Sequence, residues 1–141
     1  MRATPPPPLD ELVARFRDAW RRRDLEALAD LWDGGGDSCT TYVAEEIPGA
    51  LVGVAAISDY WRSVFERFRD IEVFLRPLAV DVLDGVAWLL SLGAFRGVRL
   101  ADGAQVHTDG VRVAMVLRLT PVGWKVVHYI EAPVRGPDGE R

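Results

Sequence analysis

Hydrophobic residues recur at helical spacing over the first part of the chain. Their spacings of three and four residues predict an amphipathic helix over residues 9–23. Its apolar stripe consists of Leu9, Leu12, Val13, Phe16 and Trp20. Asp24 is a suitable N-cap for a second helix, which the glycines at 34–36 end. The inward side of that second helix comprises Leu25, Leu28, Leu31 and Trp32.

A third helix is expected over residues 54–68. Its apolar face comprises Ile57, Tyr60, Trp61, Val64, Phe65 and Phe68. A short strand at residues 39–43 and a loop at 45–53 precede it. The helices are thus concentrated in the first half of the chain.

Alternating and β-branched residues dominate the second half. A strand over residues 71–82 is interrupted by Pro77, which indicates a sheet edge or a bulge. Asp84-Gly85 predicts a tight hairpin turn into a strand over 86–98. A turn at Asp102-Gly103 leads into a strand over 105–119. The pattern therefore predicts long antiparallel strands that follow the helices.

The last hairpin, residues 111–133, is the most informative segment. Pro121 and Gly123 predict a three-residue loop that places Trp124 opposite Thr120. The same register pairs Lys125 with Leu119, Val127 with Leu117, Tyr129 with Met115, and Glu131 with Val113. Glu131 is then a carboxylate on an otherwise apolar face, which makes it the best single indication of a site.

The two faces of this hairpin are both largely apolar, so we expect the sheet to be covered on both sides. One face carries Val113, Met115, Leu117, Val127, Tyr129 and Glu131. The other carries Arg112, Ala114, Val116, Arg118, Trp124, Val126, His128 and Ile130. Three helices on one face of a curved antiparallel sheet form an α+β cone, whose ligand pocket lies between the sheet and the helices.

Composition narrows the class of protein. The chain has 141 residues, which is enough for one domain with a substantial core. We expect a proline-rich tail at 1–8, one domain at 9–133 and a polar tail at 134–141. A net charge of -4 argues against a nucleic-acid partner, and no apolar run is long enough to cross a membrane. The lone Cys39 and the absence of a signal peptide indicate a cytoplasmic protein.

Three segments carry a resemblance to a known family. They are RDLEALADLW (23–32), GVAAISDYW (53–61) and GWKVVHYIEAP (123–133), the last of which resembles a Gly-Trp-x-hydrophobic-Val-His pattern. Residues 9–133 thereby resemble the nuclear transport factor two-like superfamily, in particular its SnoaL-like members, which include ketosteroid isomerases and polyketide cyclases. The resemblance implies a cystatin-like or ketosteroid isomerase-like cone, three N-terminal helices on the concave face, and a homodimer formed through the sheet.

The resemblance also suggests which face lines the pocket. In the association domain of calcium/calmodulin-dependent kinase, a pocket arginine follows the terminal tryptophan by seven residues, a position that Glu131 holds here. Trp124 and His128 would then face a dimer surface. The tyrosine and the protonated acid of ketosteroid isomerase correspond to Phe16 and Met115, which cannot donate the same hydrogen bonds. Steroid isomerisation by that mechanism is therefore not expected.

Candidate chemistry centres on Glu131, whose pKa should rise in an apolar pocket toward the range of a general acid or base. His107 and Asp109 share strand parity with Val111 and are further catalytic candidates. They supply at most two metal ligands, so no metal site and no cofactor is expected. The expected ligand pocket comprises Phe16, Trp20, Tyr42, Tyr60, Trp88, Val113, Met115, Tyr129 and Glu131. Glu45 and Glu46 lie near Tyr42, and the aromatic residues are equally consistent with a core.

The sequence thus predicts a pocket that binds, or acts on, a small apolar organic molecule with a ring system. If the protein is an enzyme, it is a cofactor-free isomerase, cyclase, hydratase or hydrolase that uses Glu131, with Tyr129 or Tyr42 orienting the substrate. The alternative is a non-catalytic dimeric ligand-binding or assembly module of the same fold. The missing donors at Phe16 and Met115 favour this alternative, whereas the lone carboxylate favours the enzyme.

Overall fold

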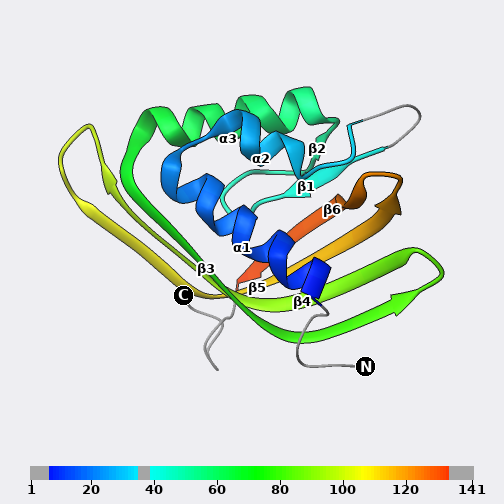
Figure 1. The fold of residues 1–141 in the computed structure, drawn as a ribbon. Helices are drawn as coiled ribbons and strands as arrows, with labels where there is room; N and C mark the ends of the chain where they lie inside the picture. The colour runs from blue at the N-terminus through cyan, green and yellow to red at the C-terminus, as the bar shows by residue number, and fades with distance from the viewer. Residues whose placement is uncertain (1–6, 35–38, 134–141) are drawn as a thin grey trace.

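Three helices and six strands make up the part of the chain that the computed structural model describes, residues 7–34 and 39–133 (Figure 1). Their order is α1 (Pro7–Arg22), α2 (Leu25–Asp30), β1 (Thr41–Val43), β2 (Leu51–Val52), α3 (Val54–Arg67), β3 (Phe68–Leu83), β4 (Val86–Arg99), β5 (Gln105–Thr120) and β6 (Gly123–Pro133). The predicted α+β class is confirmed. The predicted tail at 134–141 and most of that at 1–8 lie outside the described residues.

Helices α1 and α3 begin and end within two residues of the predicted positions, whereas α2 ends at Asp30, before the glycines at 34–36 that were expected to end it. Helix α1 begins at Pro7, two residues early, because proline is tolerated in the first turn of a helix. Asp24 caps α2: its Oδ1 accepts a hydrogen bond from the backbone N–H of Ala27 across 3.0 Å. Helix α3 begins after Gly53, whose φ of 90° favours glycine.

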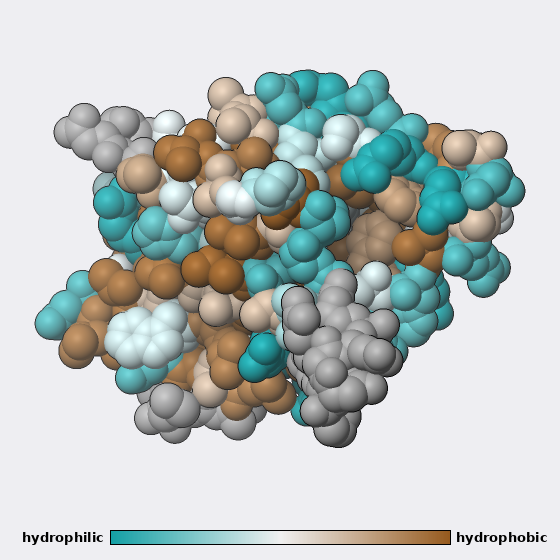
Figure 2. All heavy atoms as spheres, turned by 180° about the vertical axis from the view of Figure 1, so that it is seen from behind, coloured by the Kyte–Doolittle hydropathy of each residue, from teal (hydrophilic) through white to brown (hydrophobic). Residues whose placement is uncertain are grey.

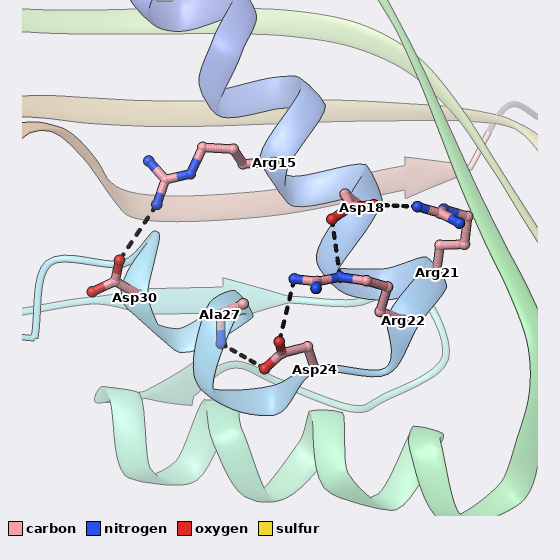
Figure 3. A network of polar contacts seen from close by, with 7 residues as sticks. All are labelled: Arg15, Asp18, Arg21, Arg22, Asp24, Ala27 and Asp30. Atoms are coloured by element: carbon pink, nitrogen blue, oxygen red, sulfur yellow. Dashed lines mark hydrogen bonds and ion pairs between the residues drawn. The ribbon is translucent and has the colours of Figure 1, made fainter.

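A polar network surrounds the junction between α1 and α2 (Figure 3). Arg22 Nε lies 3.0 Å from Asp18 Oδ2, and its guanidinium also reaches Asp24 Oδ2 at 3.3 Å. Arg15 pairs with Asp30 across 3.4 Å. These side chains are exposed, so each pair stabilises the junction only slightly. The buried apolar faces of the two helices therefore determine how they pack.

One six-stranded sheet, in the order β2-β1-β6-β5-β4-β3, curves around the helices (Figure 1). Strand β3 is an edge strand with a register shift at Pro77, as predicted. Asp84 and Gly85 both have positive φ and form the predicted tight turn. Strand β2 was not predicted. It pairs antiparallel with β1, and β1 runs parallel to β6 so that Tyr42 lies beside Tyr129.

The register of the last hairpin differs from the prediction near its turn. Thr120 pairs with Gly123, so the loop has two residues, and the predicted pairing of Trp124 with Thr120 is wrong. The predicted pairs Lys125–Leu119 and Val127–Leu117 are wrong for the same reason. A bulge at Val127 then inserts one extra residue into β6. Beyond it, Tyr129 pairs with Met115 and Glu131 with Val113, as predicted.

The bulge also changes which side chains are buried. Val126 pairs with Leu117, and both are fully buried, whereas Val127 is only partly buried. The sequence had placed Val127 rather than Val126 on the inner face. This correction is confined to the turn end of the hairpin, so it leaves Tyr129 and Glu131 on the concave side.

The core fills the space between the concave face and the helices. Phe16, Trp61 and Leu28 are fully buried there. Within the described chain, helices cover only this face. On the opposite face Trp88, Leu90 and Ile130 are 41%, 39% and 45% exposed. From behind, the molecule shows several gathered hydrophobic patches (Figure 2).

Candidate functional site

A cavity of about 270 Å³ lies between the concave face of the sheet and helices α1 and α3. Its wall is largely apolar and aromatic. The lining residues are Trp20, Tyr42, Glu45, Glu46, Tyr60, Val64, Arg67, Phe68, Val73, Phe74, Leu75, Gly93, Ala94, Phe95, Val106, Thr108, Val111, Val113, Tyr129 and Glu131. This size suits a small ligand, since it lies just below the range of about 300–1,000 Å³ for ligand pockets.

Glu131 is a largely buried carboxylate on the cavity wall. The backbone N–H of Glu45 donates to Glu131 Oε1 across 3.0 Å, and the hydroxyl of Tyr129 donates to Oε2 across 2.8 Å. Burial raises the pKa of Glu131, although these two hydrogen bonds oppose the shift. The carboxyl is therefore held in one orientation, and it loses its proton at a higher pH than an exposed glutamate does.

Two buried tyrosines adjoin this carboxylate. Tyr42 and Tyr129 are 1% and 3% exposed, and both line the cavity. Burial, with a contribution from the negative charge of Glu131, raises the pKa of Tyr42 well above its ordinary value. Burial likewise raises the pKa of Tyr129. Both phenols therefore keep their protons at neutral pH and remain hydrogen-bond donors.

Charged residues also lie on the wall between α3 and the segment after β1. The Tyr60 hydroxyl donates a hydrogen bond to Glu46 Oε1. Partial burial raises the pKa of Glu46. Arg67 donates from Nε to the carbonyl oxygen of Ser63 across 3.2 Å, within α3. Its guanidinium lies 5.5 Å from the centroid of the Phe68 ring.

The structure places most of the expected pocket residues on the cavity wall. They are Trp20, Tyr42, Tyr60, Val113, Tyr129 and Glu131. Phe16 and Met115, at 0% and 1% exposure, pack in the core instead. Trp88 lies on the opposite face of the sheet, where it pairs with Val116 and is 41% exposed, in contrast to the expectation that it lines the pocket.

His107 and Asp109 do not lie where the strand pattern predicted. Gly93 pairs with Val111 but Phe95 pairs with Thr108, so β5 bulges at Asp109 and Gly110. The bulge reverses the alternation, and the side chains of His107 and Asp109 are 56% and 75% exposed. Their predicted shared parity with Val111 is therefore wrong. Although they approach each other to 3.8 Å, neither lines the cavity.

Several lining residues were not predicted from the sequence, among them Val106 and Thr108. Both enter the wall because of the bulge in β5. The sequence does contain an indication of this bulge, because an isolated glycine within a strand is typical of one. That glycine is Gly110, which has a φ of 66°. Phe95 and Arg67 had no such signal, because the tertiary packing of β4 and α3 positions them.

The arrangement is suited to acid–base chemistry. Among the described residues, no three His, Cys, Asp or Glu side chains lie close enough together to hold a metal ion. Helices in the described ranges are too short or too polar to cross a membrane. The titratable residues in the cavity lining are three glutamates, three tyrosines and one arginine: Glu45, Glu46, Glu131, Tyr42, Tyr60, Tyr129 and Arg67.

The model of the SnoaL-like domain matches residues 9–134. The chain belongs to this family. Its domain therefore extends over almost the whole sequence and contains every residue of the cavity. A comparison with curated proteins gives no significant sequence match.

Solved structures with the same fold span the SnoaL-like domain. A nuclear transport factor 2-like superfamily protein from Salmonella enterica has a TM-score of 0.81 at 22% identity, over 94% of each chain. A ketosteroid isomerase-like protein from Erwinia carotovora atroseptica has a TM-score of 0.73 at 17% identity, over 92% of this chain and 95% of that one. A nuclear transport factor 2-like protein with a cystatin-like fold from Novosphingobium aromaticivorans has a TM-score of 0.71 at 23% identity, over 94% and 84%. These similarities establish the cystatin-like fold and leave function to the site.

Proposed function

We propose that this SnoaL-like protein binds a small, largely apolar ring compound in the cavity and acts on it by cofactor-free acid–base catalysis. Glu131 is the acid or base. Isomerisation, cyclisation, hydration or hydrolysis fits such a group, since each needs a proton to be moved at a carbon or an oxygen.

The observation that carries this proposal is the environment of Glu131. It is a largely buried carboxylate on an apolar cavity wall, and two hydrogen bonds fix its orientation. Its raised pKa brings it closer to neutral pH, where a carboxyl can both take up and release a proton. Tyr42 would orient the substrate, because its phenol stays protonated, whereas the Tyr129 hydroxyl holds Glu131 in place.

The test compares wild-type protein with Glu131→Gln. A panel of ring compounds is first screened for ligands that raise the melting temperature, because binding to the folded state stabilises it. Each ligand is then followed for turnover by NMR. Glu131→Gln should retain binding of neutral ligands and lose roughly 100-fold or more in turnover, as expected for a general acid or base.

The control variant is Glu66→Gln. It makes the same chemical change at an exposed position of α3 that is not part of the cavity wall. Unchanged turnover in Glu131→Gln would exclude Glu131 as the acid or base.

A second candidate function is a non-catalytic ligand-binding or assembly module. Phe16 and Met115, which correspond to two hydrogen-bond donors of ketosteroid isomerase, are buried in the core and supply no donor of that kind. Ligands that bind without any turnover, in wild type and variant alike, would favour this candidate.

We also infer a cytoplasmic homodimer that forms through the outer face of the sheet. Exposed Trp88, Leu90 and Ile130 support this interface, because an apolar patch of this kind marks an interaction surface. The single Cys39 fits a reducing compartment. Sedimentation should show a dimer that Leu90→Glu converts to a monomer, and cell fractionation should recover the protein in the cytosol.

A further inference from the structure

The cavity wall has an unequal distribution of charge. Three carboxylates line it, from Glu45, Glu46 and Glu131, whereas Arg67 is the only Lys or Arg of the described chain in the lining. Arg67 is held against its own helix by its hydrogen bond to Ser63 and lies over Phe68. The charge of Arg67 also acts on Glu46, whose pKa it lowers, so Arg67 is already opposed by a carboxylate of the same wall.

Glu131 has no cationic partner within the described residues. Both groups that donate to it, the Glu45 N–H and the Tyr129 hydroxyl, are neutral. Neighbouring Glu46 and Glu45 add repulsion, which contributes to the raised pKa of Glu131. Buried carboxylates are ordinarily paired with a cation, because desolvation of an isolated charge costs free energy. The cavity thus lacks a positive charge at this position.

The aromatic lining is compatible with a positive charge. Tyr42, Tyr60 and Trp20 line the cavity together with the carboxylates. The faces of such rings attract ammonium groups, and aromatic residues combined with carboxylates are a recurrent means of recognising amines. An anionic ligand would instead be repelled by the carboxylates at short range.

We propose that the ligand of this cavity is a ring compound that carries a protonated amine, with the ammonium placed at Glu131 and the ring against the apolar wall formed by Val73, Phe95 and Val106. This inference rests on the proposed function, since it assigns the chemical class of the ligand for the same cavity. A cavity of about 270 Å³ accommodates one or two fused rings with a short aminoalkyl chain.

The test uses three probes that share an indole ring: tryptamine, which is cationic, tryptophol, which is neutral, and indole-3-propionate, which is anionic. Calorimetric titration of the full-length protein at neutral pH should rank tryptamine at least about tenfold tighter than tryptophol, as a desolvated charge pair implies, with no detectable binding of the propionate. Added salt should weaken the binding of tryptamine more than the binding of tryptophol.

Variants assign the effect to Glu131. Glu131→Gln should bring the affinity for tryptamine down to that for tryptophol, and Glu66→Gln should leave the ranking unchanged. If wild-type protein binds tryptophol or indole-3-propionate as tightly as tryptamine, or more tightly, the inference of an amine ligand is overturned. The proposed function of the pocket would still stand. Absence of binding by all three probes and by the wider ring panel would overturn both. The order of affinities of the three compounds is measured on wild-type protein. It therefore tests the charge of the ligand even if Glu131→Gln folds poorly.

Discussion

Tyr42 and Tyr129 stack face to face, with ring centroids 4.4 Å apart and ring planes inclined by 11°. They come from β1 and β6, which run parallel, and Tyr129 also donates to Glu131. The stack therefore positions the donor that orients the candidate catalytic carboxylate.

Replacing Tyr129 with Phe keeps the ring and removes this donor. We expect the pKa of Glu131 to rise further, since the hydrogen bond from Tyr129 lowers it. The free energy of unfolding should fall by about 1 kcal/mol, the typical contribution of such a bond. Carbon-13 NMR of the Glu131 carboxyl across a pH titration measures the shift. Tyr60→Phe, which removes the donor to Glu46 instead, is the matched control. A lower Glu131 pKa in Tyr129→Phe would contradict the assigned role.

The stability of Glu131→Gln should depend on pH relative to wild type. Because burial raises the pKa of Glu131, the folded state binds its proton more tightly than the unfolded state does. The stabilisation from protonation is present below the unfolded-state pKa and is lost as pH rises through the folded-state pKa. The variant should therefore gain stability relative to wild type as pH rises above about 4, the ordinary pKa of a glutamate, toward the raised pKa of Glu131 in the folded state. Urea unfolding at several pH values tests this. Glu66→Gln should show no such trend, and a gain toward low pH would show that the sign is wrong.

Gly110→Ala should destabilise the bulge in β5. Its φ of 66° lies in the left-handed region, where a side chain costs about 1–2 kcal/mol. If the strand relaxes to regular alternation, Thr108 leaves the cavity wall and ligand binding weakens as well. Thermal unfolding and titration with a ring ligand measure the two effects. Asp109→Ala, at the adjacent exposed position, should change the free energy of unfolding by less than about 0.5 kcal/mol.

Gly93→Ala tests how tightly the cavity floor is packed. An added Cβ would lie 3.1 Å from Val113 Cγ2 and 3.3 Å from Leu75 Cδ2. Overpacking of this kind costs about 1–3 kcal/mol. Val113→Ala removes the closest contact, so a double-mutant cycle should show a smaller cost of Gly93→Ala in that background. Equal costs in both backgrounds would mean that Val113 does not limit the space at Gly93.

Side-chain positions can be predicted from the sequence where periodicity acts alone, but not where a strand changes its alternation. Apolar spacing located α1 and α3, and Asp24 marked the start of α2. Glu131 reached its predicted partner only because a two-residue loop and a bulge at Val127 together equal the three-residue loop that was expected. No second register change cancels the bulge at Gly110. His107 and Asp109 therefore lie outside the cavity. A single inserted residue reverses every side chain beyond it, so strand parity holds only between bulges.

The prediction that Trp88 lines the pocket was wrong for a different reason. Parity along β4 separates two faces but cannot say which of them the helices cover, because that depends on packing between distant segments. Cavity residues such as Phe95 and Arg67 depend on the same packing. Their positions follow from how α3 lies over the sheet, which local pattern does not specify.

The parallel pairing of β1 with β6 also bears on how the protein folds. Tyr42 lies in the first third of the chain and Tyr129 near the end of the domain, yet they are register partners. Contacts between such distant segments slow the folding of β-rich domains, because closing the long intervening loop costs entropy. The inner wall of the cavity is therefore completed only when β6 docks between β5 and β1. Ligand affinity should thus appear in the last kinetic phase of refolding, which makes a bound ring compound a reporter for the arrival of the final strand.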